Sequence, residues 1–204
     1  MTSDRHKGAA EALSDSDHAV LDAARASILD VGWRRTTLTD VARRAGVSRM
    51  TLYRRWPDMP GLLGDLMTRE WTTAMARVVG ESHAAESVLE QVRRRVVQVA
   101  RAIRHDELFA KIIHVDPELL LPYLLDRRGR SQEMVLRMLE PLLREGQRRN
   151  EIRTGDPALI ARTLVLTAQG FTLSLQTMTD RGTGPAEADF EAELGVLVER
   201  YLAP

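Results

Sequence analysis

Apolar residues recur every three or four positions along most of this chain, which is the spacing of an α-helix with one buried face. The first such stripe consists of Val20, Leu21, Ala24, Ile28 and Val31, and it predicts a helix over residues 17–31. No segment shows the strict alternation of apolar and polar residues that is typical of a half-buried strand. The pattern therefore predicts an all-α protein.

The same spacing continues to the C-terminus and divides the rest of the chain into helices. We expect them over residues 38–45, 49–56, 59–79, 84–103, 106–114, 117–125, 131–150, 157–178 and 186–202. The helix over 59–79 is long enough to join two units, so we place a domain boundary inside it. This gives a flexible arm over 1–14, a small domain over 15–65 and a larger helical domain over 66–204.

Residues 37–56 carry the signals for two short helices joined by a tight turn. Thr37 is suited to cap the first helix, and Asp40 stands three residues later, where its side chain reaches back to the cap. Gly46 follows, and glycine turns a chain most easily after a helix. Ser48 is a good N-cap for the second helix. The segment is therefore predicted to be a helix-turn-helix.

The second of these helices has an apolar face and a basic face. Leu52 and Trp56 lie four positions apart and are expected to point inward. The outward face and its edges carry Arg49, Met50, Thr51, Tyr53, Arg54 and Arg55. Such a helix fits the DNA major groove, with its first residues at base edges and its cations at phosphates.

Charge supports this interpretation because it is unevenly distributed. The whole chain is neutral, with 29 basic and 29 acidic residues. Between Trp33 and Trp56, however, there are seven arginines and one aspartate, a net charge of +6. A local basic patch is the electrostatic signature of nucleic-acid binding.

The motifs of this region resemble those of the TetR family of bacterial transcriptional regulators. The matching segments are 28–32, 37–42, 45–48, 51–53 and Trp56-Pro57. The resemblance implies an all-helical homodimer with an N-terminal DNA-binding domain and a C-terminal domain that binds an effector and dimerises. It also implies DNA contacts from residues of both helices, namely Thr37, Thr39, Arg49, Met50, Thr51, Tyr53, Arg54 and Arg55.

Two positions depart from the family pattern. Met50 stands where the family often has a small residue, commonly glycine, so the recognition helix presents a bulky apolar group. Met59-Pro60 stands where the family commonly has Lys-Glu, of which the lysine meets a phosphate. Asp58 still offers an N-cap there, and a proline is tolerated in a first helical turn.

The last two predicted helices are more apolar than a surface helix needs to be, and a helix that is apolar nearly all round is buried on several sides. An intramolecular core explains this pattern, and so does a four-helix interface between two subunits. We prefer the interface, which the resemblance also implies. Its expected residues are Leu164, Phe171, Phe190, Leu194, Leu197, Val198 and Tyr201.

An effector cavity is harder to locate in the sequence. Methionine and aromatic side chains with a few polar groups suit an adaptable, largely apolar ligand site. By analogy with the fold, we expect the cavity to be lined by a subset of Trp71, Met75, Phe109, His114, Tyr123, Met138, Gln169 and Phe171. The alternative for each is ordinary core packing.

Composition argues against several other classes of protein. There is no cysteine, which excludes disulfides and thiolate metal sites and fits a reducing cytoplasm. His105 and His114 lie near acidic residues but are badly spaced for one helical face, so we expect no metal and no cofactor. The chain has no apolar leader and no 18-residue stretch free of charge, so we expect neither export nor membrane insertion.

We therefore expect a cytoplasmic homodimeric repressor that binds a palindromic double-stranded DNA operator and is released by a small molecule. One alternative is a helical protein-interaction module that has lost operator reading, but the intact arginines and Tyr53 argue against it. Another is a helical enzyme, but the sequence contains neither a nucleophile elbow nor a phosphate-binding loop.

Overall fold

The computed structural model describes residues 13–80, 86–179, 182 and 184–204, and every regular element in these ranges is a helix. The α-helices are α1 (Asp15–Val31), α2 (Leu38–Ala45), α3 (Arg49–Arg55), α4 (Met59–Gly80), α5 (Val88–Arg104), α6 (Glu107–Val115), α7 (Leu121–Leu125), α8 (Arg130–Arg148), α9 (Pro157–Ser174) and α10 (Glu187–Leu202). The short 3-10 helices are η1 (Trp33–Arg35), η2 (Pro117–Leu119) and η3 (Leu175–Thr177). The all-α prediction is confirmed.

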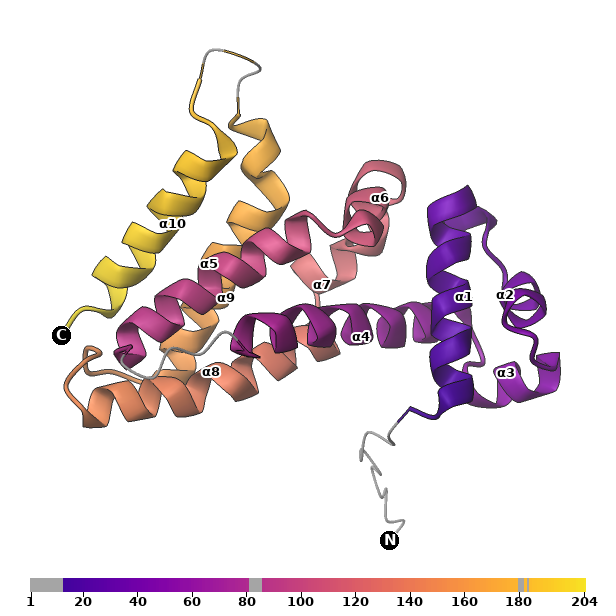
Figure 1. The fold of residues 1–204 in the computed structure, drawn as a ribbon, viewed down its shortest axis with the longest axis horizontal. Helices are drawn as coiled ribbons and strands as arrows, with labels where there is room; N and C mark the ends of the chain where they lie inside the picture. The colour runs from indigo at the N-terminus through magenta and orange to yellow at the C-terminus, as the bar shows by residue number, and fades with distance from the viewer. Residues whose placement is uncertain (1–12, 81–85, 180–181, 183) are drawn as a thin grey trace, which may run out of the picture.

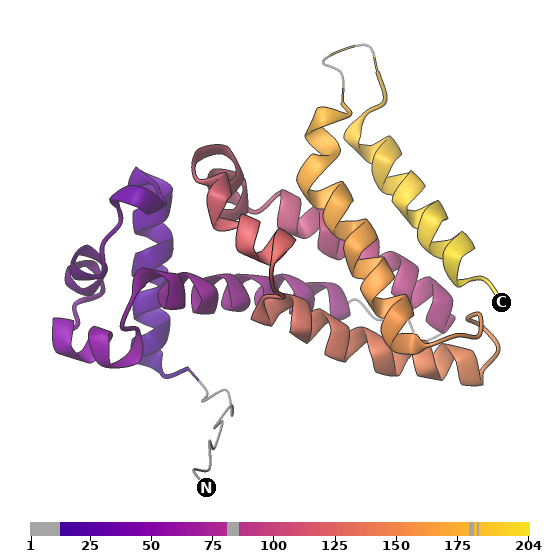
Figure 2. The same ribbon diagram turned by 180° about the vertical axis from the view of Figure 1, so that it is seen from behind.

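The helices form two packed groups that α4 connects (Figures 1 and 2). At one end, α1, α2, α3 and the first half of α4 bury a core that includes Leu21, Val41, Leu52 and Leu66. Leu108 of α6 also belongs to this core. At the other end, α5, α8, α9 and α10 bury a second core, which includes Val92, Leu143, Ile160, Leu194 and Val198.

Most predicted helices are present, with a few differences at their ends. The predicted helix over 117–125 is divided into η2 and α7, and Pro122 lies in the first turn of α7. The predicted helix over 157–178 ends as η3. Ser14, which we expected in the flexible arm, caps α1 by accepting a hydrogen bond from the Asp17 backbone. The rest of that arm up to residue 12, and the predicted helical start at 84–85, lie outside the described residues.

The segment Pro157–Thr177 is long and apolar enough, by length and composition, to cross a membrane, unlike the expectation from its charge spacing. In the fold, α9 packs against α5, α8 and α10. Part of its apolar surface is thus buried within the chain, and other side chains such as Leu159 and Leu166 remain exposed.

Candidate nucleic-acid interface and effector cavity

The first helix of the predicted helix-turn-helix has the predicted bounds, and the second begins as predicted at Arg49 but ends at Arg55, one residue before the predicted end. The Thr37 hydroxyl donates to the Asp40 carboxylate at 2.6 Å and accepts from the Asp40 backbone at 3.2 Å. This hydroxyl donor, with Arg43 nearby, holds the pKa of Asp40 below its usual value. Gly46 ends α2 in the left-handed conformation, with φ at 69°, and Ser48 caps α3 through the Thr51 backbone.

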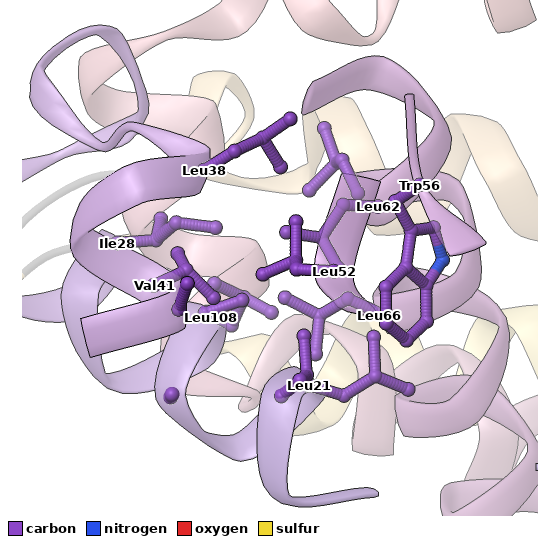
Figure 3. Packing of buried hydrophobic residues seen from close by; sticks show 14 of the residues in the cluster. Leu21, Ile28, Leu38, Val41, Leu52, Trp56, Leu62, Leu66 and Leu108 are labelled. Atoms are coloured by element: carbon purple, nitrogen blue, oxygen red, sulfur yellow. The ribbon is translucent and has the colours of Figure 1, made fainter. Parts of the chain in front are cut away.

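The inner side of α3 is fixed by one leucine and one tryptophan (Figure 3). Leu52 is 1% exposed and Trp56, the first residue after α3, is 2% exposed. The Trp56 indole N–H donates to the Asp65 carboxylate of α4 at 2.7 Å. The orientation of α3 is therefore set by packing and by a charge-assisted hydrogen bond to α4.

The opposite side of α3 is open to solvent. Met50 is 80% exposed and Tyr53 is 46% exposed. Arg49 and Arg54 are exposed and make no ion pair with any described residue, while the Arg55 guanidinium lies 5.7 Å from the centre of the Trp56 ring. On the same helix, the Thr51 hydroxyl lies 2.9 Å from the Ser48 hydroxyl. At the start of α2, Thr37 is exposed and Thr39 is half-buried. The predicted DNA contacts on α3 are thus all exposed to solvent.

Not all arginines of the basic patch are available to a ligand. Arg44 pairs with Asp30 at 2.6 Å, and Arg43 lies 3.4 Å from Asp40. Arg34 pairs with Glu118 at 2.6 Å, and this guanidinium lowers the pKa of the Glu118 carboxyl. The net charge counted along the sequence therefore overstates the field of the patch, which is carried mainly by α3.

The start of α4 lacks the cation that the family resemblance implies there. Met59 is half-buried and packs against the first core. Asp58 caps the helix as expected, because its carboxylate accepts the Gly61 backbone N–H at 2.8 Å. A phosphate contact at this position could come only from the backbone.

Besides the ion pair of Arg34 with Glu118, two aspartates make polar links between the DNA-binding end and the rest of the chain. In the first, the buried Asp116 accepts the Trp33 backbone N–H at 2.9 Å, although the two residues lie 83 positions apart. In the second, Asp65 pairs with Arg130 of α8 while it holds Trp56. Sequence reasoning missed both links because no local pattern signals so distant a partner.

A cavity of about 500 Å³ lies between α4, α5, α6, α7, α8 and α9. Four of the predicted effector residues line it: Trp71, Phe109, Tyr123 and Gln169. The rings of Trp71 and Phe109 meet edge to face at 6.1 Å, and the Gln169 side-chain oxygen accepts from Gln132 at 3.3 Å. The volume falls within the range of small-molecule sites.

A second, smaller cavity of about 80 Å³ lies beside the first, and its wall is almost wholly apolar. The two share the lining residues Val99, Val135, Val165 and Ala168. Met75 and Met138, also predicted for the effector site, line this smaller cavity.

Two predicted effector residues line neither cavity. His114 is exposed at the end of α6, where its Nδ1 lies 2.7 Å from the Ala110 carbonyl oxygen. Phe171 packs against the second core. Helical periodicity places both on apolar stretches, but it does not tell which side of a buried helix faces a cavity.

Four arginines line the cavities, none of which we predicted. Arg128 pairs with Glu133 at 2.7 Å, and Arg130 pairs with Asp65 as described above. Arg127 lies 5.6 Å from the centre of the Tyr123 ring. They belong to the loop and first turn that open α8.

The fourth arginine, Arg95 of α5, lines the smaller cavity. Its Nε is buried and has no hydrogen-bond partner. Burial lowers the pKa of the Arg95 guanidinium, and the neighbouring charge of Arg94 lowers it further. The Glu86 charge acts in the opposite direction, but Arg94 binds that carboxylate with two hydrogen bonds of 2.9 Å each.

The predicted dimer residues fall into two groups. Leu164, Leu194 and Val198 are 1–2% exposed because their own chain covers them, so they are unavailable to a partner. Phe171, Phe190 and Tyr201 are half-buried, and Leu197 is 49% exposed. The exposed apolar side chains of these two helices also include some that we did not predict, namely Leu159, Leu166 and Val196.

One histidine lies in a cluster with two glutamates that the sequence did not predict. His105 meets Glu187 and Glu191 of α10 closely enough for the three to hold a metal ion. Arg104 already pairs with both glutamates, at 2.6 Å in the case of Glu191. A metal would have to displace this guanidinium, so the cluster is better described as an ion-pair network between α5 and α10.

Comparisons with known proteins agree on one class. Residues 20–66 match the model of bacterial regulatory proteins of the tetR family. An uncharacterised HTH-type transcriptional regulator of Mycobacterium bovis is 34% identical over 156 residues, which cover 76% of this chain and 79% of that protein.

Solved structures share the whole fold. The transcriptional repressor QsdR of R. erythropolis, from the TetR family, aligns with a TM-score of 0.66 and 16% identity over 93% of this chain and 96% of that one. The regulator FadR of Bacillus subtilis, in complex with stearoyl-CoA, aligns with a TM-score of 0.64 and 17% identity over 91% of this chain and 98% of that one.

Proposed function

Because this chain belongs to the TetR family of bacterial transcriptional regulators, we propose that it acts in the cytoplasm as a homodimeric repressor of a palindromic operator. The chain is a DNA-binding transcriptional regulator, so the alternative of a protein-interaction module is not favoured. The observation that carries the proposal is the exposed face of α3, which presents Arg49, Met50, Tyr53 and Arg54 to solvent. The opposite side of this helix packs on the first core, and Trp56 next to it is hydrogen-bonded to Asp65 of α4. A face of this kind is shaped to enter the major groove.

Within that face, the side chains have different tasks. The unpaired guanidinium groups of Arg49 and Arg54 and the Tyr53 hydroxyl suit phosphates and base edges. Met50 offers an apolar group of the kind that packs against a thymine methyl. Thr37 and Thr39, at the start of α2, suit backbone phosphates near the groove.

Two substitutions on α3 test this assignment. Tyr53→Phe and Arg54→Ala should each weaken binding to DNA from the region flanking the gene of this protein, and each should leave thermal stability nearly unchanged because both side chains are exposed. If Arg54 neutralises a phosphate, its loss should also reduce the slope of log affinity against log salt by about one. Gel shifts over a salt series measure the DNA affinity and its dependence on salt. Arg77→Ala, on the exposed part of α4, is the matched control and should bind as the wild type does.

We also propose that the larger cavity, with its smaller neighbour, is the effector site. Its walls are mainly apolar, with a few amide and guanidinium groups, which is the composition of a site for a largely apolar small molecule. The stearoyl-CoA complex of the FadR protein, which has the same fold, supports a ligand with a long hydrocarbon part. The cavity also lies next to Asp65, because Gly64 and Arg130 line it, so its contents can act on the link to Trp56.

Filling the cavity should remove its capacity for an apolar ligand. Ala168 lines both cavities, and Ala168→Phe places a ring in the shared wall. We expect binding of 1-dodecanol, measured by calorimetry, to weaken at least about tenfold. Ala76→Phe, on the exposed face of α4, should bind the alcohol as the wild type does. Equal binding by the Ala168 variant would place the ligand elsewhere.

The second subunit, we propose, binds to the outer faces of α9 and α10. Leu166 is 70% exposed, Leu159 61% and Leu197 49%, although they lie on helices whose other faces form the second core. Gly170, one turn after Leu166, has no atom within 4 Å of the place where a side chain would begin, so a partner helix can approach closely there. A second copy meeting this face would form a four-helix interface.

Release from DNA follows if the effector changes the separation of the two α3 helices. Successive major grooves on one face of DNA lie about 34–36 Å apart, so a dimer binds only when its recognition helices match that distance. Because α4 both lines the cavity and holds Trp56, an effector that shifts α4 alters this separation.

A further inference from the structure

One of the four cavity-lining arginines differs from the others in its interactions with the protein. Arg128 and Arg130 each pair with a carboxylate, and Arg127 lies over an aromatic ring. Arg95 has no ion pair, hydrogen bond or ring contact with any residue in the described ranges. Among the four cavity-lining arginines it is therefore the one without a partner of any of these kinds in the described residues.

The surroundings of Arg95 disfavour an unpaired cation when no ligand is bound. The side chains that share its cavity are apolar, among them Met75, Val78, Met138 and Leu142. A guanidinium stays charged in proteins, and in these surroundings the half-buried Arg95 side chain has its Nε enclosed without a hydrogen-bond partner. The adjacent Glu86 carboxylate does not relieve it, because Arg94 binds both oxygens. An anion that enters the cavity would supply the missing partner.

We propose that Arg95 binds the carboxylate of an amphipathic effector whose hydrocarbon part extends through the adjoining larger cavity. The inference rests on the proposed effector site and adds the chemical class of its ligand. The planar guanidinium matches a carboxylate with two parallel hydrogen bonds, a geometry that an ammonium group cannot offer.

The placement of Arg95 also sets the direction of the ligand. The smaller cavity is lined by Met75 and Val78 from the second half of α4, whereas the larger cavity is lined by residues between Pro60 and Trp71 from the first half, such as Gly64 and Met67. The carboxylate is thus held at the end remote from the DNA-binding helices, and the hydrocarbon part points toward Asp65. Along α8, Met138 and Gln132 line the two cavities and lie about 9 Å apart by helical rise, a span that suits a hydrocarbon chain.

The test compares dodecanoate with 1-dodecanol, which has the same chain length and no charge. Calorimetry on the full-length wild type should show that dodecanoate binds at least about tenfold more tightly, because a buried hydrogen bond to a charged group is strong. In Arg95→Met this preference should fall to about twofold or less, while 1-dodecanol binds at least as well as before. Arg101→Met, which removes an exposed arginine from the same helix, should keep the wild-type preference.

Thermal melts show whether a loss of binding reflects unfolding. Arg95→Met removes an unpaired cation from an apolar wall, so it should melt at the wild-type temperature or above. A preference that persists in Arg95→Met would overturn the proposal and place the carboxylate at the arginines that open α8. Equal binding of both probes by the wild type would also overturn it, yet would leave the cavity as an effector site. Binding of neither probe would contradict the effector site itself and the inference with it.

Discussion

Replacing Trp56 by alanine should unfold the DNA-binding end of the protein and abolish operator binding. The side chain is 2% exposed in the first core and its indole N–H donates to Asp65. Loss of a buried aromatic side chain costs about 3–5 kcal/mol, a large fraction of the stability of a small domain. Trp56→Phe should cost less, because the ring remains and only part of the volume and the hydrogen bond are lost.

Two measurements locate this effect. Urea unfolding at fixed protein concentration gives the change in the free energy of unfolding, and hydrogen exchange shows whether the amides of α2 and α3 lose protection before those of α8 and α9. Met50→Ala is the control on the exposed side of the same helix, and its stability should stay within about 0.5 kcal/mol of wild type. If Trp56→Ala unfolds like this control, α3 is not held as described.

Replacing Leu166 by glutamate should convert the protein from dimer to monomer. In the isolated chain this side chain is 70% exposed, so the charge costs little there. In the proposed interface the charge would be buried twice by symmetry, at a cost of several kcal/mol, on the order of that for any unpaired buried charge. Operator affinity should fall by about a hundredfold or more, because one recognition helix no longer strengthens the binding of the other.

Sedimentation of the wild type and two variants at micromolar concentration measures this change. Leu125→Glu is the matched control, since Leu125 is 76% exposed at the end of α7 and belongs to neither of the two helices proposed to meet the partner. It should sediment as the wild type does. A wild type that is already monomeric, or a Leu166→Glu variant that remains dimeric, would remove the proposed interface.

The helix-turn-helix was predictable from sequence because its determinants are local. Thr37 and Ser48 cap the helices whose first turns they precede, and Gly46 takes the left-handed conformation that the turn needs. The four-residue spacing of Leu52 and Trp56 fixes the buried side of α3 and so its exposed side. Each inference required only neighbours along the chain.

The cavity and the dimer face were only partly predictable, since both depend on contacts between distant segments. Because α9 is apolar on more than one side, its sequence alone does not distinguish Leu164, which its own chain buries, from Leu166, which remains exposed. Arg95 resembles any arginine on the polar side of an amphipathic helix until the fold places it beside α4 and α8. The pairing of Asp116 with Trp33 likewise has no local signal.

Selection of bound sequences from a random pool of double-stranded DNA tests whether two α3 helices of a dimer read one operator. The wild type should enrich a palindrome whose half-site centres are separated by about one helical turn of DNA, 34–36 Å, or a multiple of it. Met50→Gly should change the preferred bases within each half-site and preserve the spacing, because Met50 lies on the exposed face of α3. Enrichment of no sequence, or of a single site without two-fold symmetry, would contradict operator binding by two α3 helices of a dimer.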